Sequence, residues 1–250
     1  MTLSPQSNGA RFAAVPLTSR GTAATQWHTA DLPRLDLRAC GALVLVAPHP
    51  DDETLGLGAT AAQLAASGIH VQIVSVSDGG AAYAGMNRVV LETTRRQELS
   101  RAAAILGVDQ PLALGLPDGQ LADHESQLVD LLAGILEGRG RETWCAATWR
   151  GDGHPDHESV GRAAAAAAAR AGVTFMEYPV WMWHWATPAD PEVPWHRACA
   201  IPLTDFAIGR KVSAAQCFRS QFEAPDRDGE PVLPAFVLRR LLSVGEVVFQ

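Results

Sequence analysis

The stretch Leu43 to Gly58, LVLVAPHPDDETLGLG, decides the fold. It opens with four strand-forming residues, Leu43 to Val46, and passes through a polar turn into residues with helical spacing. A continuous apolar run bounded by prolines is typical of a central strand of a parallel sheet, which is buried on both faces. In open α/β sheets ligands bind at the carboxyl ends of the strands, so the polar turn is a candidate binding site.

The turn carries one imidazole and three carboxylates: His49, Asp51, Asp52 and Glu53. The prolines on either side of His49 stiffen its backbone. His49 and Asp52 would offer one nitrogen and one oxygen ligand to a divalent metal such as zinc, with Asp51 as a spare carboxylate beside it. The alternative is that Asp51 and Asp52 only cap the following helix, whose N-terminus favours acidic residues.

Composition sets the class of protein. The chain has 250 residues, 47% of them hydrophobic, which is enough for one good-sized core. A net charge of −7 argues against a nucleic-acid or anionic-membrane partner. The four cysteines are scattered along the chain, and we interpret them as buried thiols of a protein in a reducing compartment. Without a membrane-length apolar stretch or the apolar block of a signal peptide, we expect a cytoplasmic protein with no membrane span; homo-oligomerisation is left open.

The rest of the chain alternates between strand and helix patterns. We expect strands at 71–77, 112–116 and 143–148, and helices at 91–106, at 125–136 and from near 157. This alternation predicts βαβ units with right-handed crossovers. The expected fold is therefore α/β and Rossmann-like, with a mostly parallel sheet and helices on both faces. One domain would span residues 39–250, after an N-terminal arm of residues 1–38.

The C-terminal third is less regular. Residues 177–185, EYPVWMWHW, are expected to start as a strand and to form core or pocket wall. Their aromatic faces could stack on a sugar, so the candidates for the substrate site are Trp181, Trp183 and Trp185. His184 is expected to be an ordinary hydrogen-bonded residue. We expect a helix over 204–222, a loop over 222–234 that could act as a lid, and a helix then a strand within 235–250.

A second polar turn follows the strand at 143–148 and repeats the design of the first. It contains His154, Asp156 and His157, and a helix is expected to start near His157. If the two strands are neighbours, His49, Asp52 and His157 can converge on one ion. Three protein ligands leave an open coordination position, which distinguishes a catalytic zinc site from a structural one.

The two turns together, Ala47 to Glu53 and Gly153 to His157, resemble those of the LmbE-like (PIG-L-like) de-N-acetylase family. The resemblance runs over about Leu43 to Gln221. It also covers Arg95-x-x-Glu98, the LGLPDG of residues 114–119, and Lys211 leading to Ser220-Gln221. It implies a Rossmann-like fold, a zinc ion or another divalent metal such as Fe²⁺, and hydrolysis of an N-acetyl group, usually on a glucosamine-type sugar.

The resemblance also implies roles for individual residues. The metal ligands would be His49, Asp52 and His157. Asp51 matches the general base, His154 the histidine that supports the oxyanion, and Asp156 the carboxylate that orients His154 and keeps it protonated. Arg95 matches an arginine that contacts sugar hydroxyls, and Asp118 resembles a substrate-loop acid. Some members have a tyrosine two residues before His154, where this chain has Asp152.

The predicted function is zinc-dependent removal of an N-acetyl group from a small N-acetylglucosamine-type sugar or sugar conjugate. A metal can lower the pKa of bound water from about 15.7 to near 7 and polarise the amide carbonyl. Asp51 would move the proton and His154 would face the oxyanion. The alternatives are an amidase on a different amide, such as a thiol-sugar conjugate, and a non-catalytic sugar-binding relative. A two-metal phosphoesterase would need more bridging ligands.

Overall fold

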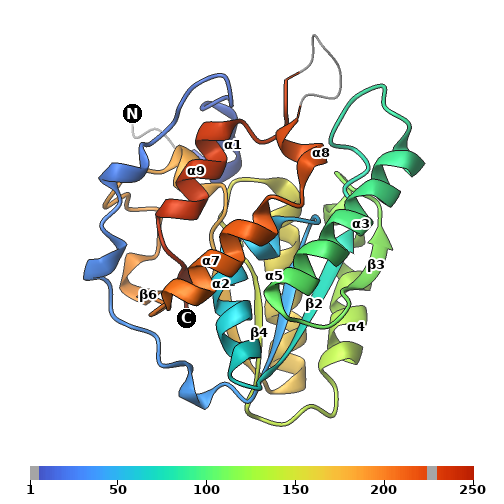
Figure 1. The fold of residues 1–250 in the computed structure, drawn as a ribbon, viewed down its shortest axis with the longest axis vertical. Coiled ribbons are helices and arrows are strands. Elements are labelled where there is room, and N and C mark those ends of the chain that lie inside the picture. The colour runs from blue at the N-terminus through green and yellow to red at the C-terminus, as the bar shows by residue number, and fades with distance from the viewer. Residues whose placement is uncertain (1–5, 224–229) are drawn as a thin grey trace.

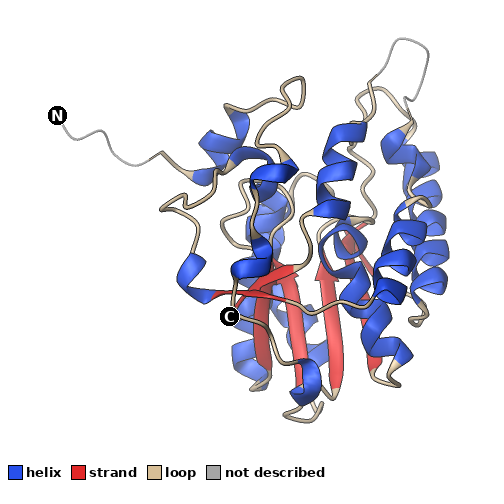
Figure 2. Ribbon diagram, turned by 60° about the vertical axis from the view of Figure 1, so that its left-hand side comes forward, coloured by secondary structure: helices blue, strands red, loops and turns tan. Residues whose placement is uncertain are grey.

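The computed structural model describes residues 6–223 and 230–250, and these form one seven-stranded sheet with helices on both faces (Figures 1 and 2). The strand order is β3 (Leu112–Leu116), β2 (His70–Ser77), β1 (Ala42–Ala47), β4 (Thr143–Thr148), β5 (Thr174–Tyr178), β7 (Val247–Phe249) and β6 (Ala198–Ala200). The first five strands are parallel, whereas β7 is antiparallel to both of its neighbours. The predicted α/β class with a mostly parallel sheet is confirmed.

Strand β1 is buried on both faces because its apolar side chains alternate between two cores. Leu43 and Leu45 pack with α2 (Asp52–Ala66), α3 (Arg88–Leu106) and α7 (Asp205–Ala215). Val44 and Val46 pack on the other side with α4 (Glu125–Leu136) and α5 (Pro155–Ala171). Figure 1 shows α7 beside α2 and α3 on the near face. The continuous apolar run predicts this two-sided burial.

The order of the strands places the two polar turns next to each other. From β1 the chain builds β2 and then β3 on one side, and it then crosses over to build β4 on the other side of β1. Ala42 of β1 is in register with Thr143 of β4, so both strands end at the same edge. The strand order therefore reverses between β1 and β4, and a crevice opens at such a switch point.

Helix α2 is broken near its middle and is tied there to the C-terminal segment. Leu57 leaves the helical conformation, and the carboxylate of Glu246 accepts hydrogen bonds from the freed N–H groups of Ala59 and Thr60, both at 2.8 Å. Lys211 of α7 donates to the same carboxylate at 2.9 Å. A Cβ at position 56 would lie 2.2 Å from the ring of Tyr178, so only glycine fits there. Glycine at this position lets α2 approach the Tyr178 ring of β5 closely.

The described part of the N-terminal arm packs against the rest of the molecule. It forms α1 (Asn8–Ala13), where no clear sequence period predicts a helix, and three short 3₁₀ turns. Trp27 and Leu35 are buried, and Trp27 packs edge-on against Trp183 with ring centroids 5.0 Å apart. The arm is thus integral to the core, while the domain boundary at residue 38 stays a prediction.

The C-terminal third agrees with expectation at residues 177–178, which are in a strand, and differs from it in the helix expected over 204–222. Strand β5 ends at Tyr178, and the chain then turns into the short helix α6 (Met182–Trp185). The helix expected over 204–222 is two helices, α7 and α8 (Arg219–Phe222), because residues 216–218 form a turn. The segment expected as a lid includes residues 224–229, which lie outside the described residues. The predicted C-terminal helix and strand are confirmed as α9 (Ala235–Ser243) and β7.

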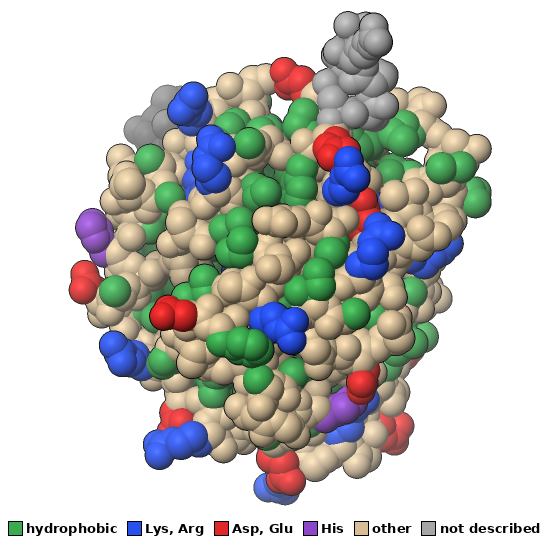
Figure 3. Space-filling model, viewed as in Figure 1, with side chains coloured by type: hydrophobic (Ala, Val, Ile, Leu, Met, Phe, Trp, Pro, Cys, Tyr) green, Lys and Arg blue, Asp and Glu red, His purple; other side chains and the backbone are tan. Residues whose placement is uncertain are grey.

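The surface in view carries acidic and basic side chains interspersed with apolar ones (Figure 3). This pattern gives no single-sign patch on that face of the kind that binds a polyanion through bulk charge. Within residues 6–223 and 230–250, no helix combines the length and the apolar character that crossing a bilayer requires.

Candidate metal and catalytic site

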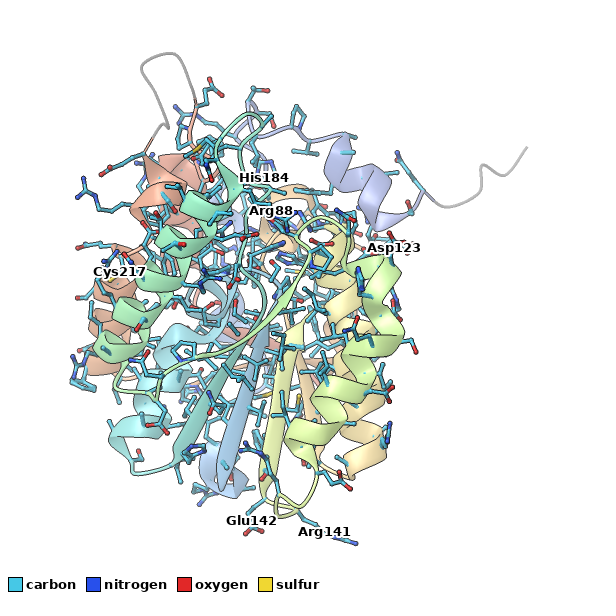
Figure 4. All side chains as sticks on the ribbon, turned by 90° about the vertical axis from the view of Figure 1, so that its right-hand side faces the viewer. Arg88, Asp123, Arg141, Glu142, His184 and Cys217 are labelled. Atoms are coloured by element: carbon cyan, nitrogen blue, oxygen red, sulfur yellow. The ribbon has the colours of Figure 1, made fainter. Side chains whose placement is uncertain are left out.

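The site lies at the carboxyl edge of the sheet. In Figure 4, Arg141 and Glu142, which precede β4, lie at the lower end of the molecule, whereas Arg88 and His184 lie in the upper part. The polar turns after β1 and β4 both lie at the upper end, because parallel neighbouring strands end at the same edge of the sheet.

The structure brings His49, Asp52 and His157 together. His49 Nδ1 lies 3.1 Å from one carboxylate oxygen of Asp52, and His157 Nε2 lies 3.2 Å from the same oxygen. One ligand atom from each of the three side chains lies within 4.8 Å of the others. A second, overlapping group within the same distance consists of His49, His154 and Asp156. The expected convergence of the two strand ends is therefore observed.

The three side chains fit a divalent transition metal. His157 Nε2 is buried and has no hydrogen-bond partner among the described residues. Leaving such an atom unpaired costs about 1–3 kcal/mol, which a bound cation would recover. Two imidazoles with one carboxylate are a ligand set found with zinc and also with non-haem iron(II).

The charges of the cluster reinforce one another. Burial alone would lower the pKa of His157, but the charge of Asp52 and the hydrogen bond with Asp152 raise this pKa to about 9. Burial opposes ionisation of Asp52, yet His157 and His49 hold the pKa of its carboxyl well below the usual range. Without metal, the site therefore favours an ionised Asp52 between protonated imidazoles, and a bound cation would take the place of those protons.

Asp51 lies beside the cluster without belonging to it. Its backbone has φ 138°, which is strained for a residue with a Cβ and costs on the order of 1–3 kcal/mol. The carboxylate of Glu53 accepts the Asp51 N–H at 3.1 Å and supports this conformation. The residue is 5% exposed and lines a cavity. Burial raises the pKa of Asp51 to about 8, although the nearby Arg95 opposes this rise.

Arg95 is held against the backbone behind Asp51. Its guanidinium donates to the carbonyl oxygens of Gly79 and Pro50, each at 3.0 Å, and lies 3.4 Å from the Asp51 carboxylate. A Cβ at Gly79, where φ is +68°, would lie 2.1 Å from Arg95 Nη1, so glycine is required there. Arg95 lines the cavity but is 3% exposed. Its predicted contact with sugar hydroxyls stays a prediction.

His154 and Asp156 are arranged differently from expectation. His154 is the N-cap of α5, and its Nδ1 accepts the Asp156 backbone N–H at 3.2 Å. The Asp156 carboxylate instead lies 3.2 Å from His49 Nε2, because the backbone N–H groups of Gly119 and Leu121 hold it there at 2.8 and 3.1 Å. Burial and the charges of the neighbouring histidines lower the pKa of His154 to about 3, so the structure favours a neutral ring.

Asp118 also contacts His49. One carboxylate oxygen lies 3.0 Å from His49 Nε2, and the other accepts the Ala81 N–H at 2.7 Å. Burial opposes its ionisation, but the bond with His49 holds the pKa of Asp118 below its usual range. Asp118 lines the cavity, so its predicted role in substrate binding stays open to test.

Asp152 is the site residue that the sequence reasoning missed. Its carboxylate lies 2.8 Å from His157 Nδ1 and is fully buried. In the sequence, position 152 stands out only as the place where some members of the resembling family have a tyrosine. The signal that could have found it was a second acid five residues before His157, in a turn already rich in ligating residues.

A cavity of about 290 Å³ opens onto the cluster. Its wall includes Leu55, Val180, Trp181, Gln221 and Leu233 beside the polar residues described above. The rings of Trp181 and Phe12 of α1 pack with centroids 5.3 Å apart, which ties the arm to this wall. Such a lining, apolar with a few convergent polar groups, suits a small ligand.

The other aromatic candidates do not line this cavity. Trp183 packs against Trp27, and Trp185 Nε1 donates to the backbone oxygen of Asp152 at 2.7 Å. His184 is hydrogen-bonded to the carbonyl oxygen of Val15 and to Arg240, both at 3.0 Å, as expected for an ordinary buried histidine.

Comparison with known proteins finds one family model and several similar sequences and structures. The family model for GlcNAc-PI de-N-acetylase (PIG-L) matches residues 44–168, half of the chain. A 1D-myo-inositol 2-acetamido-2-deoxy-alpha-D-glucopyranoside deacetylase from Mycobacterium sp. (strain KMS) is 36% identical over 155 residues, covering 52% of this chain and 50% of that protein. Diacetylchitobiose deacetylase from Thermococcus kodakarensis is 32% identical over 122 residues, covering 48% of this chain and 46% of that protein.

Among solved structures, a conserved protein from Thermus thermophilus is similar, with a TM-score of 0.56 and 30% identity. The match covers 72% of this chain and 79% of that one. The chain spans about half the length of the two curated relatives described above. The matched region contains both polar turns and the strands that position them.

Proposed function

Because the chain belongs to the PIG-L family of GlcNAc-PI de-N-acetylases, we propose that it is a metal-dependent hydrolase that removes the N-acetyl group from a small N-acetylglucosamine-type sugar or conjugate. One observation carries the proposal. The ligand atoms of His49, Asp52 and His157 converge beside a cavity whose wall also holds the carboxylate of Asp51. Two relatives with different acetylated sugar substrates, an inositol glycoside and diacetylchitobiose, support the substrate class.

His49, Asp52 and His157 would hold the metal, and zinc is the metal we propose, with Fe²⁺ as the alternative for the same ligand set. When bound, the metal supplies Lewis acidity, which activates water and polarises the amide carbonyl. Asp118 and Asp156 both contact His49 Nε2, which leaves His49 Nδ1 directed to the cluster. They act as orienting partners of this ligand.

Asp51 is the general base in this proposal. Its carboxylate borders the cavity and is not needed as a ligand, so it can take a proton from water and pass it to the leaving amine. Arg95 favours the ionised carboxylate by its charge, and Glu53 holds the strained backbone in place. We therefore propose that Arg95 mainly positions Asp51, whereas contact with the sugar is secondary.

His154 supports the oxyanion as a neutral donor. Its Nδ1 is occupied by the Asp156 N–H, so the neutral ring carries its proton on Nε2. Since His154 lines the cavity, this N–H can donate to an oxygen that becomes negative during the reaction. A neutral imidazole serves this role, and the ring does not need the protonation that the resemblance implies.

Trp181 and Gln221 complete the substrate side of the cavity in this proposal. The Trp181 ring offers a face for a sugar ring, and Gln221 offers amide hydrogen bonds to hydroxyl groups. We also propose a cytoplasmic location, supported by four cysteines that are all unpaired.

Acetate release tests the function. The purified protein, loaded with zinc, is incubated with N-acetylglucosamine, its inositol glycoside, diacetylchitobiose and an acetylated thiol-sugar conjugate. We expect acetate from at least one sugar, loss of the signal with a chelator, and recovery on adding Zn²⁺ or Fe²⁺. Acetate release that survives complete metal removal would overturn the proposal, as would zinc-loaded protein that leaves the whole panel intact.

A further inference from the structure

We propose that Asp152 is a positioning residue of the metal centre. It sets the tautomer of His157 and ties this ligand to residues 180–182, of which Val180 and Trp181 line the cavity. The inference rests on the metal site proposed above, but it does not depend on which amide is hydrolysed.

The carboxylate of Asp152 is held by four donors. One oxygen accepts from the N–H groups of Val180 and Met182, both at 2.9 Å. The other oxygen accepts from the Trp181 N–H at 2.9 Å and lies 2.8 Å from His157 Nδ1. Four donors match the capacity of a carboxylate, so its orientation is fixed.

His157 is the ion-pair partner of Asp152. Across residues 6–223 and 230–250, Asp152 forms its one ion pair with His157, and both side chains are fully buried. A buried carboxylate with neither arginine nor lysine beside it needs a strong donor, and the imidazole N–H supplies it. The contact is therefore specific to the histidine.

This contact decides which nitrogen of His157 faces the cluster as a ligand. An ionised carboxylate only accepts hydrogen bonds, so Nδ1 carries the proton. The neutral ring then has its lone pair on Nε2, the atom that lies 3.2 Å from Asp52 and has no hydrogen-bond partner in the described structure. A carboxylate behind a histidine ligand orients the ring and raises its basicity toward the metal.

The same carboxylate connects the metal ligand to the substrate wall. Val180 and Trp181 line the cavity, and their N–H groups bind Asp152. Trp185 also donates to the Asp152 backbone oxygen, which holds the turn against α6. Asp152 thus fixes the position of His157 relative to Val180 and Trp181 in the cavity wall.

The substitution Asp152→Asn tests the inference. The amide oxygen can still accept from Val180 and Met182, but the NH₂ group would face two donors, Trp181 N–H and His157 Nδ1–H. His157 relieves this conflict by moving its proton to Nε2, which removes the ligand. We expect zinc affinity, measured by competition with a chromophoric chelator, to fall at least about 10–100-fold. Circular dichroism verifies that the variant is folded.

Glu177→Gln is the matched control. Glu177 is also a buried carboxylate at the same edge of the sheet, but it pairs with Arg150 and Arg197 and contacts no described histidine. Its variant should keep the zinc affinity of the unmodified protein. A folded Asp152→Asn protein with unchanged zinc affinity would overturn the inference.

A measurement on the unmodified protein keeps the test decisive if the variant does not fold. In the zinc-loaded protein, ¹⁵N NMR of the histidine rings should show His157 protonated at Nδ1 and metal-bound at Nε2. Zinc at Nδ1, or a proton on Nε2, would overturn the inference. Both readouts are independent of substrate, so a failure of acetate release would count against the proposed function alone.

Discussion

Replacing Asp51 with asparagine should abolish most of the turnover while leaving the metal in place. Asp51 lies in the cavity wall next to Asp52, but the three converging ligand atoms belong to other side chains. Asparagine has the same shape, and its oxygen can still accept from Arg95. The substitution therefore removes the base and preserves the packing around it.

The size of the loss follows from the role. A positioned general base contributes about 10²–10⁴ in rate, which is about 3–5 kcal/mol of barrier. The assay compares kcat for acetate release with the metal content of each protein by elemental analysis. Asp78→Asn is the matched control, since Asp78 is a buried carboxylate after β2 that pairs with Arg96 and does not line the cavity. Near-normal turnover in Asp51→Asn, or loss of its metal, would refute the reasoning.

The same variant should change how stability depends on pH. Burial raises the pKa of Asp51 from 3.8 to about 8, so the folded protein holds this proton more tightly than the unfolded chain. The unmodified protein therefore loses stability as pH rises from about 4 to about 8, and asparagine does not titrate. In urea unfolding of chelator-treated proteins, the free energy of unfolding of Asp51→Asn minus that of the unmodified protein should be larger at pH 8 than at pH 5. If this difference in unfolding free energy became smaller as pH rises, the upward shift assigned to the pKa of Asp51 would be contradicted.

Three further substitutions test other parts of the site, and a fourth tests the ion pair that supports helix α2. His157→Ala should lose its metal by elemental analysis, because two ligands remain; full retention would exclude it as a ligand. His154→Ala should lower kcat by about 10²–10³ with little change in KM, whereas a pure KM effect would argue against oxyanion support. Trp181→Ala should raise KM more than it lowers kcat, and the reverse would place it in the chemistry. Lys211→Met should destabilise by about 3–5 kcal/mol in urea, since Glu246 stays buried without its cation; unchanged stability would count against this ion pair.

The parts of the site that the sequence predicts are those set by local pattern and strand order. Residues 43–46 form an unbroken apolar run, and the alternation of strands and helices after it implies a parallel sheet. Once β1 and β4 are neighbours, the turns that follow them must meet. The convergence of His49, Asp52 and His157 follows from that single fact.

The remaining contacts depend on segments that meet only in the folded chain. The family resemblance pairs Asp156 with His154, two residues away, but two N–H groups of the loop at 119–121 direct its carboxylate to His49. Asp152 takes its partners from residues 180–182, about 30 positions later. No local pattern in the sequence specifies such pairings.

The positions of the tryptophan side chains also could not be predicted from the sequence. The run of residues 177–185 is expected to start as a strand, and β5 ends at Tyr178. The chain then turns so that Asp152 can accept three successive N–H groups. Trp181 then faces the cavity, while Trp183 and Trp185 pack inward. Composition indicates a wall rich in tryptophan, but tertiary contacts decide which ring borders the ligand.

The most direct test of the account is the position of the metal itself. Anomalous diffraction at the zinc edge from crystals of the zinc-loaded protein should show one peak at about 2.0–2.2 Å from His49 Nδ1, His157 Nε2 and a carboxylate oxygen of Asp52. The Asp51 carboxylate should lie outside that shell. A peak bound by Asp51, or a metal located away from these three side chains, would contradict the account.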